Sequence, residues 1–250
     1  MSCRDTTVLL WAVAFLVACQ GGENPASRDE VVVSAAASLT DAFTALETTF
    51  ESAHPEFDVV LNLGGSSLLR QQIIEGAPVD VFASANITNM DQVVKAGEAT
   101  NPQIFAANHL VIAVPAGNPA GITGLSDFAN SSLLIGLCFE EAPCGDFARR
   151  VLANAGVVPS LDTWEPDVRA LLTKVEAGEL DAGITFVTDV LSAEGAVEGV
   201  EIPDQFNVKA EYPIAVLTRA PHPEGGASFV EFVLSTEGRS ILTSFGFLPP

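Results

Sequence analysis

The sequence predicts an α/β protein made of two lobes with a cleft between them. From residue 31 onward, short apolar runs typical of buried strands alternate with segments whose apolar residues recur at helical spacing. The chain has 250 residues, enough for one large domain or two small lobes with a sizeable core. Because the segments follow one another at short βα spacing, we expect a largely parallel sheet.

The first unit sets this pattern. Residues 31–36 (VVVSAA) form an apolar run that predicts a buried strand, and apolar residues at positions 39, 42, 43, 46 and 50 predict a helix over 39–50. Further strands are expected at residues 59–63, 79–83, 110–114, 133–137, 183–186 and 214–218. Further helices are expected at residues 68–75, 145–155, 168–177 and 227–245.

Composition and charge exclude several classes of protein. Hydrophobic residues make up 48% of the chain and charged residues 17%, as in globular proteins, and the one long apolar run lies at the N-terminus. A multispanning membrane protein is therefore excluded. With 32 acidic and 11 basic residues the net charge is −21, so nucleic acid would be repelled. We interpret the acid excess as a solvated surface, because net charge does not report the polarity of a buried site.

The N-terminus indicates export. Residues 8–17 form an apolar run of ten, the length of a signal-peptide core and too short for a comfortable membrane span. Residues 16–19 (LVAC) resemble the bacterial lipobox, which predicts a lipoprotein signal peptide over 1–18 and a lipid-bearing Cys19 that anchors the exported protein to the cell membrane. An ordinary cleaved signal is the alternative. The polar residues 19–30 are typical of a tether.

Two of the four cysteines remain for the folded part. Cys3 leaves with the signal peptide, so Cys138 and Cys144 are expected to form a disulfide in an oxidising compartment. A cysteine nucleophile is the alternative, but no base or orienting partner is recognisable nearby. The three histidines are scattered without metal-ligand spacing. We therefore predict no metal site and no cofactor.

Four predicted helices begin in a way that leaves backbone N–H groups free. Residues 38–41 (SLTD) have the form of a capping box, and residues 64–67 (GGSS) precede the next helix. Residues 143–145 (PCG) and 166–168 (PDV) begin two more. Each start alone is most simply an ordinary cap. If the four converge, they form an anion site without a cationic side chain.

Several segments closely resemble the molybdate-binding proteins of bacterial ABC transporters. The similarity spans roughly residues 31–249 and is carried by residues 35–40 (AAASLT), 65–68 (GSSL), 76–85 (GAPVDVFASA), 167–169 (DVR), 211–216 (EYPIAV) and 232–247. The resemblance implies a type II periplasmic-binding-protein fold with residues 31–109 and 213–250 in one lobe and 110–212 in the other. It implies a monomeric receptor, not an enzyme, that captures molybdate and tungstate and delivers them to a permease with its ATPase.

The resemblance also implies which residues hold the ligand. The family uses two serines, two backbone amides and a tyrosine hydroxyl, which correspond here to Ser38, Ser66, the amides of Cys144 and Val168, and Phe186. A doubly charged oxyanion offers only acceptors, so neutral donors can satisfy it completely. We therefore interpret Arg70 and Arg169 as solvent-facing or ion-paired and not as clamps on the anion.

Phe186 departs from the family pattern. A phenylalanine cannot donate the hydrogen bond of the family tyrosine, which should cost about 1–3 kcal/mol unless water, Thr185 or Thr188 substitutes. The departure leaves open a receptor of the same fold for another anion, such as sulfate or a carboxylate. An exported hydrolase is a further alternative, but residues 64–67 match neither a phosphate-binding loop nor a nucleophile elbow.

Overall fold

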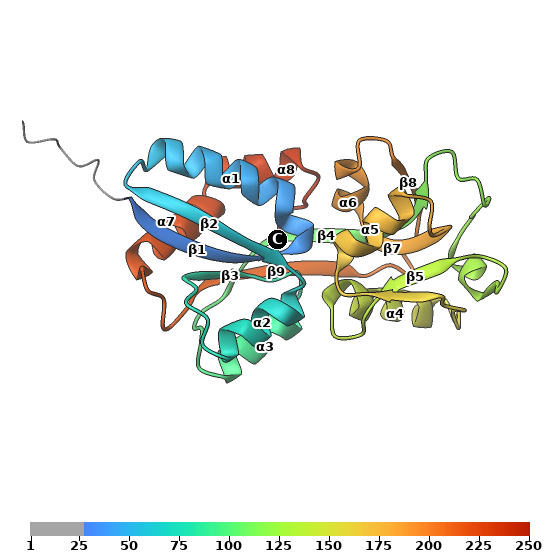
Figure 1. The fold of residues 1–250 in the computed structure, drawn as a ribbon, viewed down its shortest axis with the longest axis horizontal. Coiled ribbons are helices and arrows are strands. Elements are labelled where there is room, and N and C mark those ends of the chain that lie inside the picture. The colour runs from blue at the N-terminus through green and yellow to red at the C-terminus, as the bar shows by residue number, and fades with distance from the viewer. Residues whose placement is uncertain (1–27) are drawn as a thin grey trace, which may run out of the picture.

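The computed structural model describes residues 28–250 of the chain. The predicted signal peptide, Cys19 with its predicted lipid, and residues 20–27 of the predicted tether lie outside this range. Two lobes lie side by side, and two long strands run between them (Figure 1). Within residues 28–250, no helix combines the length and the apolarity needed to cross a membrane.

The first lobe begins with the N-terminal strand. Its strands are β1 (Asp29–Ala36), β2 (Phe57–Gly64) and β3 (Val81–Ala83), and β1 lies between the other two and is parallel to both. Its helices are the short 3₁₀ turn η1 (Ala37–Leu39), α1 (Thr40–Ala53), α2 (Ser66–Ile74), α3 (Ile87–Lys95), α7 (Pro223–Leu234) and α8 (Thr236–Ser244). In Figure 1, α1 and α8 cover one face of this sheet and α2 and α3 cover the other.

The second lobe repeats the arrangement on a smaller scale. Its strands are β5 (Ile135–Cys138), β6 (Thr163–Glu165), β7 (Ala182–Phe186) and β8 (Val197–Glu201). Its helices are the 3₁₀ turn η2 (Leu125–Ala129), α4 (Pro143–Asn154), α5 (Val168–Glu176) and α6 (Val187–Ser192). Because β5 pairs in parallel with β6 and β7, α4 and α5 begin at the same edge of the sheet, which faces the first lobe.

Two long strands connect the lobes. The first half of β4 (Gln103–Pro115) pairs with β9 (Lys209–Val216), and its second half pairs with β7 and β8. The strand order is β2-β1-β3-β9-β4-β7-β5-β6, with β8 attached to β4. The lobes are thus joined through a shared sheet, and near its C-terminal end the chain returns to this junction, where Leu248 and Ala107 exchange backbone hydrogen bonds.

The sheet is mixed, so the prediction of a largely parallel sheet is wrong. β9 is antiparallel to β3 and to β4, and β4 is antiparallel to β7 and β8. Short βα spacing indicates parallel pairing within each lobe, where it is observed. It carries no information about strands that return from one lobe to the other.

Several predicted boundaries also differ. β4 begins at residue 103 instead of 110, and β9 begins at residue 209 instead of 214. The single helix expected over 227–245 is two helices, because Ser235 leaves the helical conformation and its hydroxyl accepts a hydrogen bond from the Gly238 amide at 3.1 Å. The short elements α3, α6, β6 and β8 were not predicted.

Candidate functional site

Four helix starts face one another where the two lobes meet. They surround a cavity of about 220 Å³, including the solvent at its mouth. The cavity is lined by Ala36, Ala37, Ser38, Gly65, Ser66, Ala85, Ala142, Pro143, Cys144, Asp167, Val168 and Phe186. All five ligand-binding positions expected from the sequence are therefore brought together, two from the first lobe and three from the second.

Ser38 lies in the 3₁₀ turn between β1 and α1. The predicted capping box is wrong, because α1 begins at Thr40 after Leu39 and no side-chain cap is formed. The Ser38 hydroxyl instead lies 3.1 Å from the hydroxyl of Tyr212, a fully buried residue of β9. Ser38 is 6% exposed, so its hydroxyl is held at the cavity wall by a buried partner and not by its own helix.

Ser66 is the first residue of α2. Its hydroxyl oxygen accepts a hydrogen bond from the Ala85 amide at 3.1 Å, which leaves the hydroxyl proton available to another acceptor. Gly65 before it meets the second lobe closely: a Cβ atom there would lie 3.1 Å from the Pro166 carbonyl oxygen and 3.3 Å from the Asp167 Cβ. A side chain at position 65 would require the second lobe to shift by a few tenths of an ångström at this contact.

Cys144 lies in the first turn of α4. As predicted, it forms a disulfide with Cys138 at the end of β5, with an S–S distance of 2.10 Å and a Cα–Cα distance of 5.7 Å. Pro143 begins the helix, and a Cβ atom at Gly145 would clash with the carbonyl oxygens of Cys138 and Phe139. The disulfide and the glycine thus fix the turn that presents the Cys144 amide.

Val168 begins α5. The carboxylate of Asp167 caps this helix by accepting hydrogen bonds from the amides of Arg169 and Ala170, each at 3.0 Å. That carboxylate is therefore directed at its own helix, although Asp167 lines the cavity. As the first amide of α5, Val168 N–H has no acceptor within the helix. It carries the partial positive charge of a helix N-terminus.

Arg169 is ion-paired, one of the two interpretations given to it from the sequence. Its guanidinium pairs with Asp41 in the first turn of α1, and its Nε donates to the Ala37 carbonyl oxygen at 3.4 Å. This contact joins α5 of the second lobe to α1 and η1 of the first. Arg70 donates from Nη1 to Gln92 Oε1 at 2.7 Å in an exposed contact within the first lobe.

Phe186 presents an apolar ring where the family pattern has a hydroxyl. It is 1% exposed and packs edge-on against Phe147 and Tyr212, with ring centroids 6.1 Å and 5.9 Å apart. Sequence reasoning did not single out Tyr212 as a site residue. One signal was present, because Tyr212 is the single tyrosine in a chain with 15 phenylalanines.

Asp189 was also missed by the sequence analysis. It is completely buried in α6, where Oδ2 accepts a hydrogen bond from the Phe186 amide at 3.0 Å. Among the described residues, Oδ1 has no hydrogen-bond partner. Burial raises the pKa of Asp189 to about 7, and the Phe186 amide and the charge of Arg169 oppose this shift.

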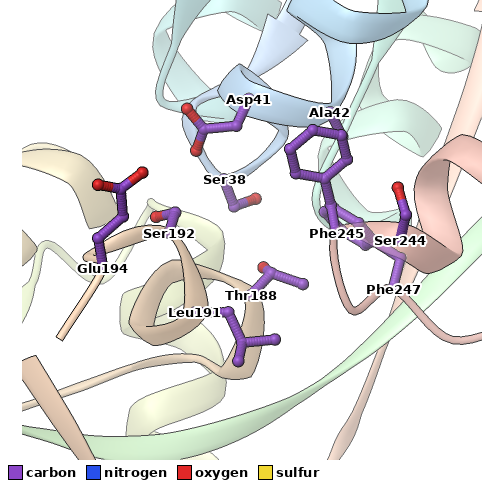
Figure 2. A pocket seen from close by; sticks show the side chains of 10 residues that line it. All are labelled: Ser38, Asp41, Ala42, Thr188, Leu191, Ser192, Glu194, Ser244, Phe245 and Phe247. Carbon is purple, nitrogen blue, oxygen red and sulfur yellow. The ribbon is translucent and has the colours of Figure 1, made fainter.

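A larger groove lies beside the cavity, between α1, α6 and the segment that ends α8 (Figure 2). Its volume is about 910 Å³ including open solvent, and Ser38 lines both spaces. Asp41 and Glu194 contribute carboxylates to the groove, which disfavour an anion there. Within residues 28–250, no group of three histidine, cysteine or acidic side chains lies close enough together to hold a metal ion.

Two lobes that meet over a small cavity of neutral donors define a solute-binding protein of the type II periplasmic-binding fold. The family model described as bacterial extracellular solute-binding protein matches residues 31–248. The chain belongs to this family, and it is a solute-binding protein and not an enzyme. Both the fold class and the class of function expected from the sequence are thus confirmed.

Known relatives match the chain over nearly its full length. The molybdate-binding protein ModA of Mycobacterium tuberculosis is 39% identical over 247 residues, covering 95% of this chain and 94% of that protein. A putative ABC transporter substrate-binding lipoprotein of Bacillus subtilis, YvgL, is 27% identical and covers 94% of each chain. The solved substrate-binding domain of a putative molybdenum ABC transporter from Clostridium difficile is 26% identical, with a TM-score of 0.66, covering 88% of this chain and 99% of that chain.

Proposed function

We propose that this chain captures molybdate and tungstate outside the cytoplasm and delivers them to the permease and ATPase of an ABC importer. The observation that carries the proposal is the convergence of Ser38, Ser66, Cys144, Val168 and Phe186 on one cavity between the lobes. The 39% identity to a molybdate-binding protein over 95% of the chain supports the choice of ligand. Molybdate is the cargo in this account, and no cofactor is involved.

The donors suit a fully deprotonated oxyanion. The Ser66 hydroxyl already accepts a hydrogen bond from the Ala85 amide, so its proton is free for the ligand. The amides of Cys144 and Val168 lie at helix N-termini, where anions are favoured. Because no cationic side chain lines the cavity, the anion is held by hydrogen bonds alone and can be released when the lobes part.

The lobes are expected to close over the anion, because its hydrogen-bond donors are divided between them. We assign residues 31–109 and 213–250 to one lobe and residues 110–212 to the other. The two serines then belong to the first lobe and the two amides to the second, so neither lobe alone holds the full donor set. An anion bound between them favours the closed arrangement because only that arrangement completes its hydrogen bonds.

We further propose that the protein acts as a monomer anchored to the membrane by a lipid on Cys19. The lipobox-like residues 16–19 support this anchor, as does the similarity to a lipoprotein of Bacillus subtilis. Radiolabelled palmitate fed to cells that produce the protein tests it. Label on the wild type but not on Cys19→Ser is expected, and an unlabelled wild type contradicts the anchor.

Calorimetric titration of the purified protein with molybdate, tungstate, sulfate and phosphate tests the ligand. Heat with molybdate and tungstate and none with sulfate or phosphate is the expected result. A thermal shift provides a second readout, since a ligand at 100 times its dissociation constant stabilises the fold by about 2.7 kcal/mol. A response to sulfate or phosphate in place of the metallates refutes this ligand while leaving the receptor role intact.

A further inference from the structure

Behind the cavity, a line of buried polar side chains runs from the second lobe to Ser38. It consists of two hydrogen-bonded pairs, Thr188 in α6 with Asn108 in β4 and Tyr212 in β9 with Ser38 in η1. The most exposed of the four is Ser38, at 6%. Buried polar groups are costly unless they are paired, so this line is a structural feature that the fold maintains.

One of these hydrogen bonds has a fixed direction, and the other is directed by the bound ligand. The Asn108 amide nitrogen donates to the Thr188 hydroxyl at 2.8 Å. The Asn108 carbonyl oxygen accepts a hydrogen bond from the His109 amide at 2.9 Å. The Ser38 hydroxyl has one proton, and when that proton is donated to the bound anion, the contact with Tyr212 is completed by the Tyr212 proton.

Tyr212 is held in its protonated form. Burial raises the pKa of its hydroxyl far above the ordinary value, and the nearby Asp189 raises it further. The ring is enclosed by Phe105, Phe186 and Phe247, with centroids 6.3 Å, 5.9 Å and 5.4 Å away, so it has little room to turn. The hydroxyl at the end of this fixed ring lies 3.1 Å from Ser38 Oγ.

We infer that Tyr212 is a positioning residue that fixes the Ser38 hydroxyl as a donor to the bound anion. Ser38 Oγ accepts the hydrogen bond from the Tyr212 hydroxyl, so the proton of Ser38 itself is directed into the cavity. The Ala85 amide does the same for Ser66. The inference rests on the proposed function, because it concerns how the same cavity favours an oxyanion without protons of its own.

A double-mutant cycle with molybdate tests this role. Tyr212→Phe keeps the buried ring and removes the hydroxyl that orients Ser38. Molybdate affinity should then fall about tenfold, because the Ser38 hydrogen bond to the charged ligand is lost or misdirected. If Tyr212 acts through Ser38, the same change made in Ser38→Ala should cost at most about twofold. In Ser66→Ala, the matched control whose serine does not contact Tyr212, the tenfold loss should remain.

Other outcomes overturn the inference. An unchanged affinity in Tyr212→Phe contradicts it, and so does an equal loss in the wild-type and Ser38→Ala backgrounds, which indicates a general structural effect. Melting temperatures of all variants show whether the fold is retained. If the wild type binds sulfate and not molybdate, the proposed function is wrong, and the same cycle performed with sulfate decides the role of Tyr212.

Discussion

At the scale of single residues, side-chain oxygens at the cavity already accept hydrogen bonds from backbone amides. Ser66 accepts from the Ala85 amide, and the Asp167 carboxylate accepts from two amides of its own helix. Such prior pairing leaves protons directed into the cavity and turns the nearest negative charge away from it. The chemistry of the site therefore depends on these hydrogen bonds as well as on which residues line the cavity.

Phe186 provides the first prediction at this scale. Phe186→Tyr adds the hydroxyl that the family pattern has at this position of the cavity wall, so molybdate should bind about tenfold more tightly. Calorimetry on the wild type and the variant measures the difference. An unchanged affinity in a variant with the wild-type melting temperature would show that the added hydroxyl does not reach the anion.

Asp189 provides the second prediction. Burial raises its pKa from 3.8 to about 7, so between these pH values the folded protein retains a proton that the unfolded chain has lost. Its contribution to stability therefore decreases as the pH rises from about 4 to about 7. Asp189→Asn removes this titration and keeps a side-chain oxygen for the Phe186 amide.

Urea unfolding of both proteins at about pH 5 and pH 8 measures this contribution. The free energy of unfolding should fall more between the two pH values in the wild type than in Asp189→Asn. The comparison cancels the titrations that the two proteins share. An equal fall in both would mean that Asp189 titrates near the ordinary value for an aspartate.

At the scale of elements, each donor is presented by the start of a helix, and each start is fixed by a different device. Ser66 follows a glycine, which lets the backbone of the other lobe approach closely. Val168 follows an aspartate that caps its helix, and Cys144 follows a proline and forms a disulfide. These devices are local in sequence, which is why the positions of three of the four starts could be predicted from the sequence.

The disulfide gives a prediction at this scale. Replacing both Cys138 and Cys144 by serine opens a loop of seven residues, which should lower the free energy of unfolding by about 2.4 kcal/mol. The turn that presents the Cys144 amide becomes looser, so molybdate affinity should fall as well. Denaturant unfolding and calorimetry measure the two effects, and reducing agent added to the wild type should reproduce them. Equal stability with and without the disulfide would contradict this role for it.

Elements set by local sequence could be predicted, whereas contacts between distant residues could not. Local patterns predict most helices and the parallel strands, because apolar periodicity is set by neighbours along the chain. The antiparallel returns of β4 and β9 could not be predicted, since they depend on contacts between residues about a hundred positions apart. The same is true of Tyr212, whose contact with Ser38 spans 174 positions.

At the scale of the whole molecule, the lobes contact each other through side chains as well as through the connecting strands. Arg169 of the second lobe pairs with Asp41 of the first and reaches the Ala37 carbonyl oxygen. The side chains of Arg169 and Asp41 are 30% and 43% exposed, so the pair should contribute no more than about 1 kcal/mol. That is enough to shift an equilibrium between open and closed lobes severalfold.

This contact gives the prediction for the whole molecule. Arg169→Gln and Asp41→Asn should each increase the radius of gyration of the ligand-free protein in X-ray scattering and weaken molybdate binding about two- to fivefold. Arg149→Gln is the matched control, because Arg149 pairs with Glu140 within one lobe. If Asp41→Asn instead tightens binding, the charges act on the anion directly and the contact does not hold the lobes together.

In the proposed binding mode, neutral donors of both lobes hold a molybdate ion in the small cavity. The most direct measurement is an anomalous difference map, recorded at the molybdenum absorption edge, from crystals grown with molybdate. One strong peak is expected between Ser38, Ser66 and the amides of Cys144 and Val168. A peak in the larger groove beside Asp41 and Glu194, or no peak in crystals of protein that calorimetry shows to be loaded, would contradict it.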